Sequence, residues 1–176
     1  MVEQMYQGQL QFLENCYTTW MALGLHPLGG TDPATKYKLI VQPHETWDGD
    51  TPGTAVSFGE PIAGTQYWVP GIHIPGNSLG YVDPNGTTPH ECGHNWQNQN
   101  GGLPPTTPQG LTESLANWIL QQAIAGYPAD WVVVGMPMGH AAVGYNCMSF
   151  FNYFMEAPGY GSNFINQMVS APKPSG

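Results

Sequence analysis

The chain has 176 residues, of which 41% are hydrophobic and only 9% are charged. This length and apolar content predict one globular domain, residues 1–176, with a substantial core. Three lysines, no arginine and twelve acidic residues give a formal net charge of −9, which argues against nucleic acids and anionic membrane surfaces as partners. No apolar run approaches the roughly twenty residues that a membrane span needs, so we expect none.

The N-terminal part, residues 1–83, is expected to contain one helix and a small mixed sheet. Hydrophobic residues recur at approximately helical spacing over residues 4–23, and Gly24 is the expected stop. Three β-rich runs follow this helix and predict strands at residues 37–41, 54–58 and 66–74.

Two prolines, Pro70 and Pro75, interrupt the third run and end it. Proline has no backbone N–H to donate across a sheet, so it occurs mainly in edge strands. We therefore expect residues 66–74 at an edge of the sheet and residues 37–41 at its centre.

The second part, residues 84–176, contains the pattern H-E-x-x-H from His90 to His94. Histidines four residues apart lie on one face of a helix and can bind one zinc ion, with Glu91 beside the metal's open position. The plainer alternative is that the histidines are ordinary polar residues of the helix and that Glu91 only completes a capping box.

The residues before the pattern favour a helix over residues 89–99. Thr88 suits the N-cap, and Pro89 suits the first helical position. Residues 127–143 are ambiguous. Further helices are expected at residues 108–125, 145–156 and 162–170.

A peptidase zinc site needs a third protein ligand and one position for water. A metzincin would have a third histidine six residues after His94, where this chain has Asn100. Glu113, on the helix expected at residues 108–125, follows His94 with eighteen residues between them. Because H-E-x-x-H-(x18)-E is the spacing of the gluzincins, we expect a Zn²⁺ site formed by His90, His94 and Glu113.

The residues around these ligands also resemble a known family. The pattern H-E-x-x-H-x-x-Q from His90, followed by E-S-x-A-N-W from Glu113, resembles the bacterial avirulence proteins of the AvrXca/Svx type, which are secreted gluzincin-like metallopeptidases. The chain is similar, less closely, to the plant basic secretory proteins, although those are basic and this chain is acidic. The likeness covers roughly residues 80–170.

The resemblance implies a zincin-like α+β fold, with a small mixed sheet, an active-site helix and a C-terminal helical part. It implies a secreted protein, although Met1–Gln4 lack the basic and apolar regions of a signal peptide. It also implies that the edge strand, here residues 66–74, pairs with an extended substrate, unless that strand only caps the sheet. In these families the residue four after the ligand glutamate orients a zinc-bound histidine. Here Asn117 would accept the remaining N–H of His90, or would only face solvent.

The implied activity is hydrolysis of a protein or peptide substrate. Zinc would lower the pKa of its bound water, and Glu91 would take the water's proton and pass it to the leaving amine. Gluzincins usually add a Tyr or His that donates to the oxyanion. The candidates for this role are His140 and Tyr145, each of which is otherwise an ordinary core or surface residue.

Cysteine usage predicts no disulfide framework. Three cysteines, Cys16, Cys92 and Cys147, allow one internal bridge at most. Cys92 is expected in the core, pointing away from the face that carries the two histidines.

Two alternatives to a zinc endopeptidase stay open. One is a catalytically silent zincin-like module for binding or surface assembly, although a purely structural metal site would not need Glu91 as a base. The other is a metal-dependent hydrolase that acts on a non-peptide substrate, such as a cell-wall conjugate.

Overall fold

The computed structural model describes residues 2–26, 40–44, 56–61, 63–64, 68–75, 87–100, 103, 107, 109–124 and 148–170. Its helices are α1 (Val2–Ala22), α2 (Thr87–Gln99), α3 (Gln109–Ala123), α4 (Met148–Glu156) and α5 (Ser162–Ser170). Its strands are β1 (Ile40–His44), β2 (Val56–Pro61) and β3 (Trp68–Pro75). The five expected helices are confirmed to within three residues at their ends. The ambiguous segment 127–143 lies outside the described residues.

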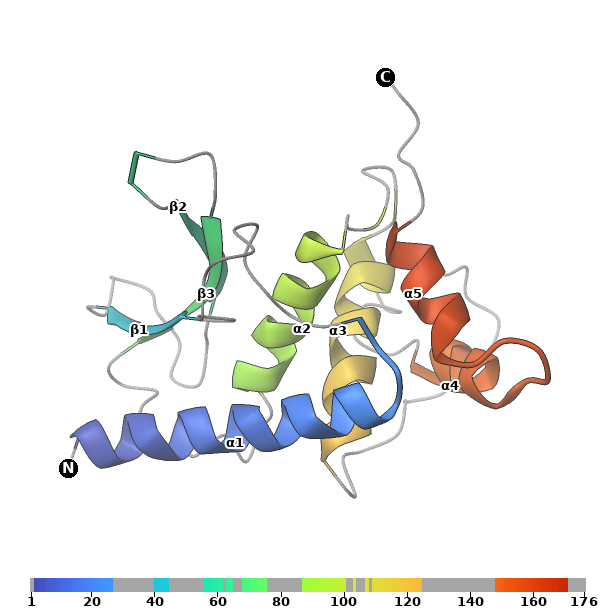
Figure 1. The fold of residues 1–176 in the computed structure, drawn as a ribbon, viewed down its shortest axis with the longest axis horizontal. Coiled ribbons are helices and arrows are strands. Elements are labelled where there is room, and N and C mark those ends of the chain that lie inside the picture. The colour runs from blue at the N-terminus through green and yellow to red at the C-terminus, as the bar shows by residue number, and fades with distance from the viewer. Residues whose placement is uncertain are drawn as a thin grey trace.

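The helices α2 and α3 lie side by side in the middle of the molecule (Figure 1). The sheet packs on the far side of α2, while α4 and α5 lie beyond α3. The long helix α1 runs across one end of this arrangement and contacts both α2 and α3. The two central helices are therefore enclosed by packed elements on several sides.

The helix α1 ends at Ala22, two residues before Gly24, the expected stop. Gly24 has a φ of 78°, a left-handed conformation that glycine adopts without steric cost. The amide of Leu25 donates to the carbonyl of Trp20 at 3.2 Å, which satisfies one of the last carbonyls of the helix. The chain is thereby turned so that Leu25 enters the core.

The three strands form one sheet in the order β1-β3-β2, with β1 parallel and β2 antiparallel to β3. The expected edge position of residues 66–74 is therefore wrong, as is the expected central position of residues 37–41, because β3 is central and β1 is an edge. The reason lies in the stagger of the strands. Among the described residues, Pro70 pairs with β2 and Pro75 pairs with β1. Within the described sheet each proline thus has one paired neighbour, and the proline rule is met locally although the strand is central.

Buried tryptophans connect the central helices to the rest of the core. Trp20, Trp96 and Trp118 are at most 1% exposed. Each indole N–H donates to an oxygen on another element or segment: Trp20 to the carbonyl of Ile119 at 2.7 Å, Trp96 to the carbonyl of His26 at 2.9 Å and Trp118 to the Oδ1 of Asn152 at 2.8 Å. Because both the ring and the polar N–H are accommodated, these residues fix α2 and α3 in position.

The two cysteines that the structure describes, Cys16 and Cys92, are buried in this core as thiols and do not form a disulfide. Burial raises the pKa of the Cys92 thiol far above its ordinary value, so the thiol stays protonated in the core. The expected core position of Cys92 is confirmed. Cys147 lies outside the described residues. Among the helices described, none is both long and apolar enough to cross a membrane.

Candidate metal centre

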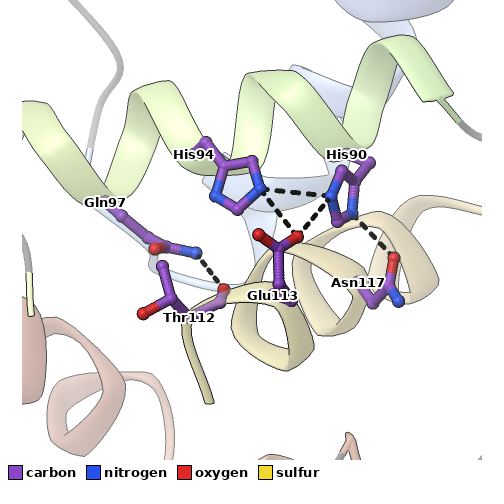
Figure 2. Close-up of polar contacts among 6 residues, drawn as sticks. All are labelled: His90, His94, Gln97, Thr112, Glu113 and Asn117. Carbon is purple, nitrogen blue, oxygen red and sulfur yellow. Dashed lines mark hydrogen bonds and ion pairs between the residues drawn. The ribbon is translucent and has the colours of Figure 1, made fainter. Parts of the chain in front are cut away.

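Three polar side chains from α2 and α3 converge on one point between the two helices (Figure 2). His90 and His94 project from successive turns of α2, and their Nε2 atoms are 3.1 Å apart. The Oε2 of Glu113, from α3, lies 3.1 Å from the Nε2 of His90 and 3.2 Å from that of His94. The two imidazole rings are nearly perpendicular, at 87°. The residues that the sequence predicts as ligands are thus brought together.

The triangle formed by these atoms has the size of a zinc site. A tetrahedral zinc ion bonds nitrogen and oxygen ligands at about 2.0–2.2 Å, which separates neighbouring ligand atoms by about 3.3 Å. The three separations of 3.1, 3.1 and 3.2 Å are close to that value. Two imidazole nitrogens and one carboxylate oxygen are also a common ligand set of catalytic zinc. The residues present therefore fit a zinc ion.

The contact with Asn117 determines the tautomer of His90. Its Oδ1 lies 2.7 Å from the Nδ1 of His90, so this nitrogen carries the hydrogen and donates it. In the neutral ring the Nε2 then has a lone pair, which points toward the Oε2 of Glu113. When Glu113 is ionised and both histidines are neutral, the Nε2 of His90 and the Oε2 of Glu113 are both acceptors and repel each other. A cation bound between them would remove this repulsion. Asn117 is 8% exposed and does not face solvent.

The surroundings of His90 favour the neutral imidazole that binds metals. Burial lowers the pKa of His90, and the neighbouring His94 lowers it further, against the opposing influence of Asn117 and Glu113. The side chains of His90, His94 and Glu113 are 12%, 15% and 16% exposed, so they are largely enclosed without being fully shut off from solvent.

Glu91 lies beside the same cluster. One of its carboxylate oxygens is within 4.8 Å of a ligand nitrogen on each histidine, and the three residues could together hold a metal ion. The Oε2 of Glu113 lies 3.1 and 3.2 Å from the two Nε2 atoms, close to the ligand spacing of a tetrahedral zinc site. Glu113 therefore suits the third ligand position, and Glu91 suits a base next to the metal.

Three further residues of α2 fix its distance from its neighbours. A Cβ on Gly93 would lie 3.0 Å from the Cα of Ala116, so the two helices approach closely at this point. Asn95 donates to the carbonyl of Gly71 in β3 at 2.8 Å, and Gln97 donates to the carbonyl of Thr112 in α3 at 3.0 Å. None of these three contacts is predicted from the sequence. The small residues Gly93 and Ala116 are a local signal for the close approach of the helices, but not for the bonds of Asn95 and Gln97.

The two residues expected to donate to the oxyanion, His140 and Tyr145, lie outside the described residues and stay predictions. No family model, no curated protein and no solved structure matches this chain.

Proposed function

We propose that this chain is a zinc-dependent endopeptidase with a zincin-like fold, in which His90, His94 and Glu113 bind the metal. The observation that carries the proposal is the triangle of ligand atoms with sides of 3.1–3.2 Å. Its size suits zinc, and its three ligands leave a fourth position for water or substrate. The resemblance to secreted gluzincins agrees with this ligand set and suggests that the protein acts outside the cell.

Each residue of the site would have a separate role in hydrolysis. Bound zinc supplies a Lewis acid that makes water more acidic and polarises the scissile carbonyl. Glu91 accepts the proton of the attacking water on its carboxylate and later donates it to the leaving amine. Asn117 holds His90 in the tautomer that presents Nε2 to the metal. His140 and Tyr145 remain the proposed donors to the oxyanion.

The strand that an extended peptide would pair with is β2 rather than residues 66–74. Both sides of β3 are occupied by other strands, whereas β2 is an edge of the described sheet. The helix that carries the histidines, α2, packs against β2 as well as β3. A peptide bound along β2 would therefore gain backbone hydrogen bonds beside the helix that carries the histidines.

The test is metal content combined with hydrolysis of an unfolded protein substrate. We expect about one zinc ion per chain, activity that a chelator abolishes and zinc restores, and a matched Glu91→Gln variant that retains zinc. The rate for that variant should fall on the order of 10²–10⁴-fold, because the base is lost. Cleavage of a cell-wall conjugate, without cleavage of peptide, would instead favour a metal-dependent hydrolase that acts on a non-peptide substrate. A zinc-loaded wild type without hydrolytic activity would favour the silent binding module.

A further inference from the structure

We propose that Gln97 is a positioning residue that holds Glu113 at its place relative to the two histidines and so sets the affinity of the metal centre. This inference rests on the proposed zinc site. It adds a role for a residue that touches neither the metal nor the substrate.

Gln97 contacts the backbone next to Glu113. Its Nε2 donates to the carbonyl oxygen of Thr112 at 3.0 Å (Figure 2). That carbonyl belongs to the peptide unit that joins Thr112 to Glu113. One side chain of α2 thus holds the backbone from which the third ligand projects.

The position of Gln97 on α2 makes this contact specific. Gln97 follows His94 by three residues, so the two side chains lie on neighbouring parts of one helix face. Both face α3, His94 toward the side chain of Glu113 and Gln97 toward the backbone before it. The bond therefore opposes movement of α3 along α2, which would change the distances from Glu113 to the histidines.

The contact is also protected from water. Gln97 is 2% exposed, so solvent cannot replace the Thr112 carbonyl as the partner of its amide without exposing the interface between the helices. A carbonyl oxygen within a helix has a second lone pair, which an amide donor can use without breaking the helix's own hydrogen bond. A neutral amide satisfies that geometry and brings no charge near the ligands.

Asn95 provides a matched control from the same helix. It is also 2% exposed, and its amide also donates to a backbone carbonyl, that of Gly71, at 2.8 Å. Its bond, however, joins α2 to β3 on the opposite side from Glu113. If buried amides of α2 act only on stability, variants at Asn95 and Gln97 should behave alike.

The experiment compares Gln97→Met with Asn95→Leu, which keep the approximate side-chain volume and remove the donor. The zinc dissociation constant is measured by competition with a chromophoric chelator, the visible spectrum is recorded after loading with Co²⁺, and the unfolding of the metal-free chain is followed separately. We expect Gln97→Met to weaken zinc binding by about 10–100-fold and to change the Co²⁺ spectrum. Asn95→Leu should lower stability while the dissociation constant stays within about threefold.

The outcomes separate the two proposals. A wild-type chain that binds no zinc would overturn the metal centre itself. If the wild type binds zinc, and Gln97→Met binds it as tightly with an unchanged Co²⁺ spectrum, the positioning role is wrong while the zinc site stands. If Gln97→Met does not fold, Gln97→Asn keeps the amide but shortens its reach. Gln97→Asn should weaken zinc binding in the same direction, and unchanged binding by that variant would equally refute the role.

Discussion

Because α2 and α3 approach closely at Gly93, we predict that Gly93→Ala changes both stability and zinc affinity. A Cβ at this position would lie 3.0 Å from the Cα, 3.1 Å from the carbonyl oxygen and 3.3 Å from the Cβ of Ala116. Two of these atoms belong to the backbone and cannot rotate away. Ordinary van der Waals contact begins at 3.4 Å. The change Gly93→Ala must therefore separate the helices by about 0.4 Å at their point of contact.

The displacement should weaken both packing and metal binding. Overpacking of a core costs about 1–3 kcal/mol, and the higher helix propensity of alanine offsets roughly 1 kcal/mol of that. Metal sites require bond lengths within about 0.2 Å of their preferred values. Gly93 lies between the two histidines, and Ala116 lies one turn after Glu113, so a shift of about 0.4 Å acts directly on the ligand triangle. We expect zinc affinity to fall about 10–100-fold.

Gly8 is the matched control for this substitution. It is also a helical glycine, but a Cβ there would meet nothing within 4 Å. Gly8→Ala should therefore stabilise the chain by about 0.5–1 kcal/mol through the change in helix propensity alone, with zinc affinity unchanged. The assays are urea denaturation of the metal-free chains and zinc competition with a chelator. The spacing argument would be refuted if Gly93→Ala stabilised the chain as Gly8→Ala does and bound zinc like the wild type.

Three further predictions concern the ligands and the core. Asn117→Ala should weaken zinc binding about 10–100-fold, whereas Asn117→Asp, which keeps an acceptor for His90, should retain most of the affinity in the same competition assay. Glu113→Gln should leave the chain folded by circular dichroism but remove the rise in melting temperature on adding zinc, which at a hundred times the dissociation constant corresponds to about 2.7 kcal/mol in the wild type. Trp20→Phe, which removes the donor to the carbonyl of Ile119, should lower the free energy of unfolding by about 1–3 kcal/mol in urea without changing zinc affinity.

Some residues of the site can be predicted from the sequence and others cannot, because some signals are local and others depend on contacts between residues far apart in the chain. His90 and His94 follow from helix geometry, since residues four apart share a face whatever the rest of the chain does. Glu113 follows from spacing within a known pattern. Gln97 and Asn95 bond to backbone carbonyls of other elements, and a carbonyl of Thr112 or Gly71 has no sequence signature. Their roles therefore become visible only when the elements are placed together.

The order of the strands shows a different limit. A proline lacks the N–H that would bond to a neighbouring strand, and this affects one side of one residue only. The prediction of an edge position extended that local effect to the whole strand. In the described sheet, β1 and β2 are staggered along β3, and both flank it from Gly71 to His73. The prolines are compatible with a central strand because of this stagger. The register that creates it depends on contacts between residues far apart in the sequence.

The way α2 and α3 are held together bears on whether the metal centre is structural or catalytic. A structural zinc ion supplies folding free energy that a small core lacks, and its four protein ligands close the site. Here a hydrophobic core that includes residues from α1, β3, α2, α3, α4 and α5 joins the two helices without any of the ligands. The described site offers three ligand atoms whose side chains keep 12–16% of their exposure, with Glu91 alongside. A fold that is already joined by its core has little need of a metal for stability, so the three ligands among the described residues, with a carboxylate beside them, agree better with the proposed hydrolysis than with a structural metal.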